Sequence, residues 1–536
     1  MNEETQRKWA EKALLTVNKA FPDITNLENW PTCDRLLLSA LECAKSINGY
    51  ALEREESALL LNQTAYYLHD KADYTQALTL YEQALIIWEK VLGKNHPDTA
   101  ITLNNLATLY EAQSDYAKAL PLHQRALMIR KTVLGRKHYE TAQSLNNLAG
   151  LYEAQGDYKK ALPLYKQALA IREKVLDREH PHTAESLNSL AGLYYAQGNY
   201  AKALPLYQRA LVIREKALGK EHPHTAAILN DIAVLYDAQG DYEEALSLYQ
   251  RALAINEKVL GKEHPDTAKI LSNLAMLYQL QSDYERALSL YQRVLAIDEK
   301  ILGKEHPNTS TTLNNLAGVY EAQGNYEEAL FLYQRALEIS EKVLGKEHPE
   351  TVTTLNNLAG VYHSQGNHEA ALSLLQQALA VRKKVLGKKH PEIATSLNNL
   401  AGVYNAQGNY VEALSLYQQA LAIWNKALGK EHPSIAATLN NMAGAYNSQG
   451  NYVKALPLYH QALAIWKKAL GKEHHNIAIT LSNLAGLHQA QGDYTQALPL
   501  YQRALAIFTK ALGKEHPHTK TVEKNYLELM KKMESN

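Results

Sequence analysis

The sequence predicts an all-α protein, a solenoid in which helical hairpins stack one on the next. Two observations carry this prediction. Histidine recurs every 42 residues from His96 to His516, and within each 42-residue unit apolar residues recur at the spacing of a helix with one buried stripe. Ten full units therefore run from His96 to Glu515 without insertion or deletion. Repetition at a fixed period is typical of solenoids, in which each unit buries its apolar face against its neighbours.

Each unit is expected to form two helices joined by a tight turn. In the unit that begins at His96, apolar residues at the i, i+3, i+4, i+7 spacing predict a helix over 98–112. These residues are Leu103, Leu106, Ala107 and Tyr110. The sequence that follows, QSDY here and QGDY or QGNY in most other units, combines turn residues with an Asp or Asn that can cap the next helix. A second helix is then predicted over 116–134.

The ends of these helices carry residues suited to start or stop them. Pro97 suits the first helical position, because its missing N–H would be unpaired there in any case. Gly135 is placed to end the second helix in the left-handed conformation. Pro121 lies inside the second helix, where it costs a backbone hydrogen bond, so we expect a slight kink that the packing accepts.

The repeats divide the sequence into three parts. A degenerate unit at about 54–95, which keeps Asn62, Tyr74 and Ala84 in register, precedes the ten full ones, so eleven repeats are expected over 54–515. Residues 1–53 differ from the repeats and are expected to form a helical segment that leads into the array and covers its first repeat. Residues 516–536 are expected to form a polar capping helix, which solenoids need for solubility.

Small and aromatic residues alternate along each unit in a pattern that resembles the tetratricopeptide repeat. In one unit these residues are Ala149, Tyr152, Tyr158, Ala161, Tyr165 and Ala168. The 42-residue length and the sequences LNNLA, ALPLYQRAL and LGKEHP are similar to the repeats of kinesin light chains and their bacterial relatives. The resemblance implies a right-handed superhelix, with first helices lining a concave groove and second helices outside. The heptad region of kinesin light chains is absent from this sequence.

The N-terminal segment carries a second resemblance. The sequence FPDITNLENWPTCDRLL is similar to the segment that joins the nucleotide-binding module of bacterial NB-ARC-type ATPases to their tetratricopeptide arrays. The ATPase motif itself is missing, because no GxxxxGK[ST] occurs and LGKEH supplies neither the glycine loop nor the hydroxyl that would meet phosphate and Mg²⁺.

Composition and charge exclude several classes of protein. Lys and Arg together number 56, as do Asp and Glu, so the chain lacks the basic excess of a nucleic-acid binder. Only two cysteines occur, Cys33 and Cys43, which indicates a reducing compartment. The N-terminus has no signal-peptide core, and no apolar run approaches the ~18 residues of a membrane span. We therefore expect a cytoplasmic protein without a membrane or nucleic-acid partner.

The repeated histidines do not predict a metal site. Zinc needs three or four donors within ~2.3 Å of one ion, whereas equivalent residues of stacked helices lie ~10 Å apart. A helix-entry role ahead of proline is the simpler interpretation. No nucleophile, carboxylate pair or His/Asp arrangement stands out from the repeat background, so we expect a non-enzymatic chain with no catalytic residues, metal or cofactor.

Paired asparagines recur on the first helix of each unit, on a face other than the buried stripe. We call the residues equivalent to Asn146 first-position and those equivalent to Asn147 second-position; eight of the ten full units keep each amide. An amide is both donor and acceptor, so a row of them can bond the backbone of an extended peptide. They can equally bond between neighbouring repeats, and the two roles are compatible. The predicted groove residues are Asn146, Asn147, Asn188, Asn230, Asp231, Asn273, Asn314, Asn315, Asn356, Asn357, Asn398, Asn399, Asn440, Asn441 and Asn483.

Gly150, one turn further along that face, is Gly in seven of the ten full units, which leaves room for a ligand to approach closely. Departures from the pattern gather in the three units that begin at His180, His222 and His264. They make the groove locally more apolar and acidic, through either sequence drift or a specificity pocket. The departing residues are Ser189, Tyr195, Asp231, Val234, Asp237, Ser272, Met276 and Leu280.

Three functional hypotheses follow. The first is a protein- or peptide-binding scaffold, kinesin-light-chain-like in its repeats, with an extended partner segment in the groove. The second is the ligand-sensing array of an NB-ARC-type signalling ATPase, separated from its ATPase module. The third, an enzyme or nucleic-acid binder, is disfavoured by the charge balance and the missing motifs. The identity of the ligand and the oligomeric state do not follow from the sequence.

Overall fold

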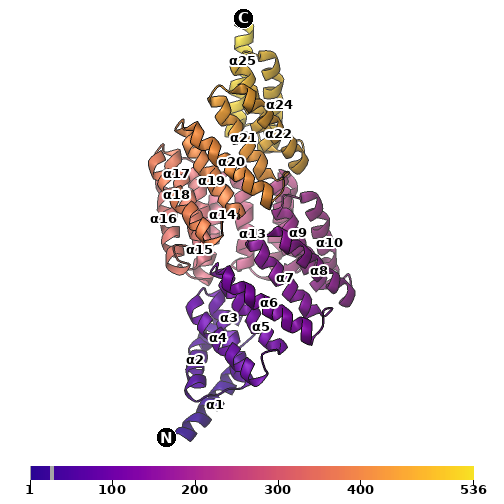
Figure 1. Ribbon diagram of the computed structural model, residues 1–536, viewed down its shortest axis with the longest axis vertical. Coiled ribbons are helices and arrows are strands. Elements are labelled where there is room, and N and C mark those ends of the chain that lie inside the picture. The colour runs from indigo at the N-terminus through magenta and orange to yellow at the C-terminus, as the bar shows by residue number, and fades with distance from the viewer. Residues whose placement is uncertain (1, 25–28, 536) are drawn as a thin grey trace. The chain divides into compact units, whose positions relative to one another are not determined.

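The computed structural model describes residues 2–24 and 29–535, and this part of the chain contains 25 helices and no strand (Figure 1). The predicted all-α solenoid is confirmed. Helices α1 (Glu3–Ala20) and α2 (Trp30–Gly49) precede the hairpins, and α25 (Pro517–Ser535) follows them. None of the described helices is both long and apolar enough to cross a lipid bilayer.

Eleven helical hairpins lie between these ends, each with a first and a second helix. The first helices are α3 (Glu55–Asp70), α5 (Pro97–Ala112), α7 (Tyr139–Ala154), α9 (Pro181–Ala196), α11 (Pro223–Gln239), α13 (Pro265–Leu280), α15 (Pro307–Ala322), α17 (Pro349–Ser364), α19 (Pro391–Ala406), α21 (Pro433–Ser448) and α23 (His475–Ala490). The second helices are α4 (Tyr74–Val91), α6 (Tyr116–Val133), α8 (Tyr158–Val175), α10 (Tyr200–Leu218), α12 (Tyr242–Val259), α14 (Tyr284–Ile301), α16 (Tyr326–Val343), α18 (His368–Val385), α20 (Tyr410–Ala427), α22 (Tyr452–Leu470) and α24 (Tyr494–Leu512).

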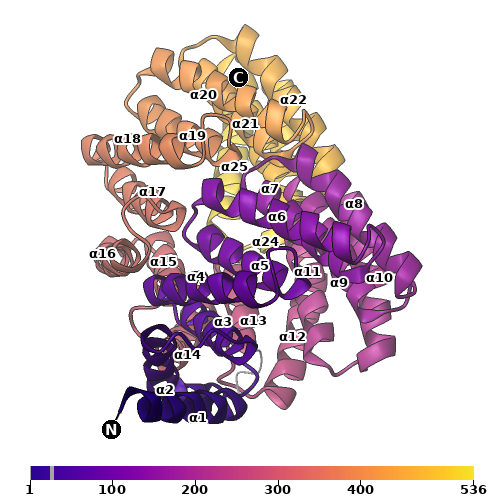
Figure 2. The ribbon, with the colours of Figure 1, turned by 60° about the horizontal axis from the view of Figure 1, so that its bottom comes forward.

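The chain divides into two compact units. The first comprises Met1–Gln155 and Lys159–Arg178, and the second comprises Gly156–Tyr158 and Glu179–Asn536. Within the second unit, each hairpin packs against the one before it, so that successive hairpins can be followed from α9 to α24 in Figure 2. Helix α25 packs against α24 and buries Val522 and Leu529.

Local signals in the sequence set the helix ends. Helix α5 begins at Pro97, and α6 begins after Asp115, whose side chain accepts a hydrogen bond from the Lys118 N–H. Gly135 follows the end of α6 with a φ of +96°, the left-handed region expected of it. Helix α6 continues through Pro121. The carbonyl that loses its partner there belongs to Ala117, which is exposed, so water can satisfy it.

Small residues let the helices of each hairpin approach closely. In α7 and α8, Ala149, Ala161 and Ala168 have no exposed surface. Tyr165 is also buried, and its hydroxyl donates to Glu153 Oε2 at 2.8 Å. The tyrosine ring fills the space between helices while its polar end reaches a partner, as buried tyrosines usually do.

Candidate functional site

The repeated histidines cap the first helices of the hairpins. Each ring accepts, at Nδ1, a hydrogen bond from the backbone N–H two residues later, at 3.0–3.3 Å. This is the N-cap position, where a side-chain acceptor satisfies one of the otherwise unpaired N–H groups of a helix. The helix-entry interpretation of the histidines is confirmed. Across residues 2–24 and 29–535, no three His, Cys, Asp or Glu side chains form a group that could hold a metal ion.

Part of the asparagine row bonds between repeats. The Asn314 amide donates to Thr354 Oγ1 of the next repeat at 2.8 Å. In three places of the second unit, a first-position side chain bonds the second-position side chain of the following repeat. These pairs are Asn188 Nδ2 to Asp231 Oδ2 at 2.9 Å, Asn273 Nδ2 to Asn230 Oδ1 at 2.9 Å and Asn483 Nδ2 to Asn440 Oδ1 at 3.3 Å. These residues hold adjacent repeats together.

Four consecutive second-position asparagines behave differently. Within the part of the chain that the structure describes, the side chains of Asn315, Asn357, Asn399 and Asn441 make no hydrogen bond. Asn399 is exposed and the other three are half-buried. Their donors and acceptors are therefore open to water or to a ligand.

A cavity of about 400 Å³, which we call the groove cavity, lies among these residues on α17, α19 and α21. Seven of its lining residues come from the asparagine row and its glycines: Asn356, Asn357, Gly360, Asn398, Asn399, Gly402 and Asn441. At Gly402 an added Cβ would meet no atom within 4 Å, whereas at Gly360 it would lie 3.3 Å from Glu321 Oε1. The cavity is thus most open at Gly402.

Two ionisable side chains, Glu321 and His363, also line the groove cavity. Burial raises the pKa of the Glu321 carboxyl, and its hydrogen bond from the Tyr333 hydroxyl, at 3.2 Å, opposes that rise. Burial, and then the neighbouring His368 ring, lower the pKa of His363. His363 is therefore uncharged at neutral pH, and uncharged amides dominate the wall. Such a surface suits hydrogen bonding to a peptide backbone better than recognition of charge.

The structure brings only some of the predicted groove residues together. Asn356, Asn357, Asn398, Asn399 and Asn441 line the cavity, while Asn314 and Asn315 lie one repeat earlier, on α15. The predictions did not include Glu321 and His363. Both stand three residues after a groove glycine, Gly318 or Gly360, on the same face of the helix, and this spacing could have identified them.

The departures from the repeat pattern lie outside the groove cavity. Asp231 accepts the bond from Asn188, and burial raises its pKa. Burial raises the pKa of Asp237 to about 6. Burial, and then the neighbouring Asp237 carboxylate, raise the pKa of Tyr195. Met276 and Leu280 on α13 are exposed. Two acidic side chains on α11 and two exposed apolar ones on α13 thus depart from the repeat pattern.

Comparison with known proteins identifies the repeat. The family model described as tetratricopeptide repeat matches residues 56–132, 114–174, 140–211, 182–258, 236–300, 266–342, 308–384, 392–468, 434–510 and 476–534. A search of curated proteins finds no match.

Several solved structures are similar to the chain. One, a protein described as a kinesin light chain with nearly identical TPR-like repeats, from Podosopora anserina, is 35% identical over 39% of this chain and 100% of its own, with a TM-score of 0.32. BtubC (BKLC) from P. vanneervenii is 26% identical over 44% of this chain and 91% of its own, with a TM-score of 0.35. A Rap protein complexed with competence and sporulation factor is 15% identical over 69% of this chain and 99% of its own, with a TM-score of 0.47. On the family match, which spans most of its length, the chain belongs to the tetratricopeptide-repeat family.

Proposed function

We propose that the chain is a non-catalytic scaffold that binds an extended segment of a partner protein in the groove cavity. The single observation that carries this proposal is the run of four second-position asparagines, Asn315, Asn357, Asn399 and Asn441, whose side chains make no hydrogen bond within the described residues. The last three of them line the groove cavity together with Gly360 and Gly402. Elsewhere in the second unit, Asp231, Asn273 and Asn483 stand at the same position and bond the neighbouring repeat.

The spacing of these amides fits an extended chain. Packed helices lie about 8–10 Å apart, and an extended strand rises ~3.3 Å per residue. Each repeat therefore spans about three residues of a bound peptide, and one amide per repeat can bond its backbone regardless of side chains. Gly402 lets that backbone approach closely.

The proposal is tested with peptides selected from a random display library on the wild-type chain, whose affinity is then measured by fluorescence anisotropy. Each neutral hydrogen bond contributes ~0.5–1.5 kcal/mol net. Replacing Asn315, Asn357 and Asn399 together by alanine should therefore weaken binding several-fold to several-hundred-fold, with an unchanged melting temperature. A large drop in melting temperature with unchanged affinity would mean that these amides serve the fold and the ligand contacts other residues.

The variant Gly402→Ala gives a second, more specific test of ligand binding in the groove cavity. Alanine is the better helix former by about 1 kcal/mol, and its Cβ meets no protein atom. The variant should fold at least as well as the wild type and bind peptide more weakly. The matched control is Gly192→Ala, at the same repeat position on α9, far from the groove cavity in sequence. Equal affinities for the two variants would contradict a ligand seated over Gly402.

The alternative function is the sensing array of an NB-ARC-type ATPase, which rests on the resemblance of the segment FPDITNLENWPTCDRLL. In that case the partner would be a ligand or a sister subunit acting through the ATPase module. A reading frame for such an ATPase next to this one in the genome would favour this alternative over the scaffold.

A further inference from the structure

Three helices of the second unit, α21, α23 and α25, begin against the ends of helices that lie 236 residues earlier in the chain. The His432 ring, which caps α21, hydrogen-bonds the backbone of Ala196 at the end of α9. His474, which caps α23, bonds Ala238 in the last turn of α11 in the same way. His516, before α25, bonds Leu280 at the end of α13. These three contacts follow one another at intervals of one repeat.

Each of these rings makes two hydrogen bonds. Nδ1 accepts from the N–H of its own helix, at 3.1 Å for His432 and His474 and at 3.2 Å for His516. The proton of a neutral ring is then on Nε2, which can donate to a backbone carbonyl. The last carbonyls of a helix have no partner inside it. One histidine therefore caps the start of its own helix and the end of another.

Glycine makes the approach possible. At Gly240 (φ +82°), just after α11, an added Cβ would lie 2.9 Å from His474 Cδ2. At Gly198 (φ +66°), it would lie 2.6 Å from Pro433 Cδ. Gly366 and Gly408 have similar φ values, +79° and +76°, but an added Cβ there would meet nothing within 4 Å. The close approach belongs to the contacted turns and is not a property of the repeat.

The second contact has an additional bond. The Tyr242 hydroxyl, at the start of α12, lies 2.6 Å from Nδ1 of His475, the first residue of α23. The two rings also stack, with centroids 6.3 Å apart. Both His474 and Tyr242 are buried.

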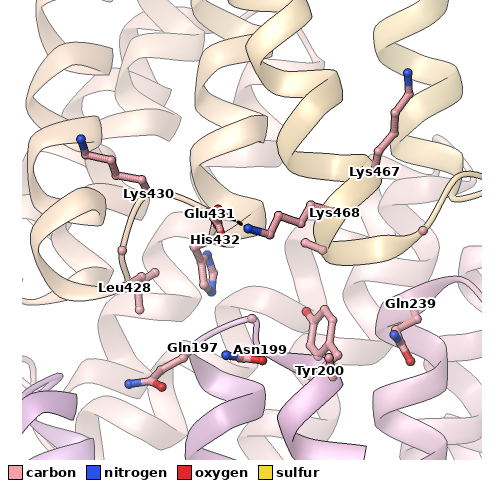
Figure 3. A pocket seen from close by; sticks show the side chains of 15 residues that line it. Gln197, Asn199, Tyr200, Gln239, Leu428, Lys430, Glu431, His432, Lys467 and Lys468 are labelled. Carbon is pink, nitrogen blue, oxygen red and sulfur yellow. Dashed lines mark hydrogen bonds and ion pairs between the residues drawn. The ribbon is translucent and has the colours of Figure 1, made fainter.

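Helices α9–α13 and helices α21–α25 form the two layers that these contacts join, and between the contacts the layers separate. A cavity of about 630 Å³ lies between the first and second contacts, and one of about 450 Å³ lies between the second and third. Figure 3 shows the first, with His432 pointing toward Gln197 and Asn199, while Lys430 and Lys467 point away. The layers are therefore joined by a few hydrogen bonds and by apolar contacts of Tyr200, Ala511 and Leu512, and the cavities interrupt the interface between them.

We propose that these three contacts form a clasp, which closes the coil of the second unit turn against turn and opens and closes reversibly. The chain between the clasped turns includes α15, α17 and α19, so closure fixes the curvature of the groove cavity and opening releases it. The clasp does not depend on the proposed function. Only the expected effect of the clasp on ligand binding depends on that function.

A pair of glycine variants tests the clasp. Gly198→Ala/Gly240→Ala places a methyl group into the contacts, whereas Gly366→Ala/Gly408→Ala costs similar backbone strain and meets no atom. Small-angle scattering should give a larger radius of gyration for the first pair only. Hydrogen exchange should speed up only for the first pair, in the turns at 197–199 and 239–241. Equal radii and equal exchange in the two pairs would overturn the proposal.

A histidine series tests the hydrogen bonds separately. His432→Asn/His474→Asn/His516→Asn keeps a good N-cap but is too short to reach the facing helix. His180→Asn/His222→Asn is the control, because within the described part of the chain these N-caps make no hydrogen bond to an earlier turn. We expect only the triple variant to expand, with helical content unchanged by circular dichroism. An unexpanded, folded triple variant would contradict the clasp. Neither measurement uses a ligand, so failure of the clasp and failure of peptide binding are distinguishable.

Discussion

At the scale of single residues, the asparagine row serves two purposes. Asn188 holds a half-buried carboxylate of the next repeat, Asp231, at 2.9 Å, whereas Asn357 makes no side-chain hydrogen bond within the described residues. The sequence cannot separate these cases, because both asparagines stand on the same helix face. What differs is the residue that the neighbouring repeat presents.

We predict opposite effects on stability for two alanine variants. Asn188→Ala should lower the free energy of unfolding by about 1–3 kcal/mol, because Asp231 loses one of its two side-chain donors in a site where burial already raises its pKa. Asn357→Ala removes no bond and adds a better helix former, so it should leave stability unchanged or raise it by up to ~0.5 kcal/mol. Urea unfolding measures both. Equal losses would show that Asn357 also joins repeats.

The clasp histidines predict a dependence of stability on pH. Burial lowers the pKa of His432 to about 4 and that of His474 to about 3, whereas an unfolded histidine titrates near 6.5. Below pH 6.5 the unfolded chain binds protons that the folded chain does not, so this stability is present above pH 6.5 and is lost as the pH falls toward 4.

Urea unfolding at pH 7 and pH 5 measures this loss, which should be smaller for His432→Asn/His474→Asn than for the wild type. Asp237 acts in the opposite direction, because burial raises its pKa to about 6 and the folded chain takes up its proton first. Asp237 is present in both chains, so the difference between them reports the histidines. The same loss in both would contradict neutral, buried rings.

At the scale of helices, the residues near each helix end were sufficient to predict where the helices begin and end. The predicted helices 98–112 and 116–134 correspond to α5 (Pro97–Ala112) and α6 (Tyr116–Val133), since His–Pro, Asp and Gly start and stop a helix through bonds within a few residues. The role of the histidine as N-cap also follows from its place before proline. Bonding of the asparagines between repeats was one of two roles that the sequence left open. Which asparagines make such bonds did not follow from the sequence, because the bonds join residues about 43 positions apart whose geometry depends on how hairpins stack.

Helix α25 should contribute more to stability than its polar sequence suggests. It packs on α24, buries Val522 and Leu529, and begins at His516 of the clasp. Removing residues 516–536 exposes an apolar face of α24, so the melting temperature should fall and the chain should tend to aggregate. Calorimetry and light scattering are the measurements. An unchanged melting temperature would show that the array needs no C-terminal cap.

At the scale of the whole molecule, a solenoid is usually stabilised by contacts between neighbours alone. The second unit adds contacts between residues 236 positions apart. These arise from small rotations that accumulate over more than five repeats, and no single repeat specifies them. His432 and His180 stand in the same motif, yet only His432 has an earlier turn of its own unit to meet. The clasp could therefore not be predicted from the sequence.

Deleting one internal repeat, His348 to Lys389, tests both kinds of contact at once. Neighbour contacts predict a folded chain that is shorter by one hairpin, because every repeat presents the same packing residues. The clasp predicts a change of register: with 42 residues removed between the turns, His474 comes to face Ala196 and His516 comes to face Ala238. Leu280 then has no histidine opposite it. Hydrogen exchange should show protection kept in the turns after α9 and α11 and lost in the turn after α13. Loss of protection at all three turns in a folded deletion variant would mean that the clasp needs its native partners, and a deletion variant that does not fold would mean that the repeats are not interchangeable.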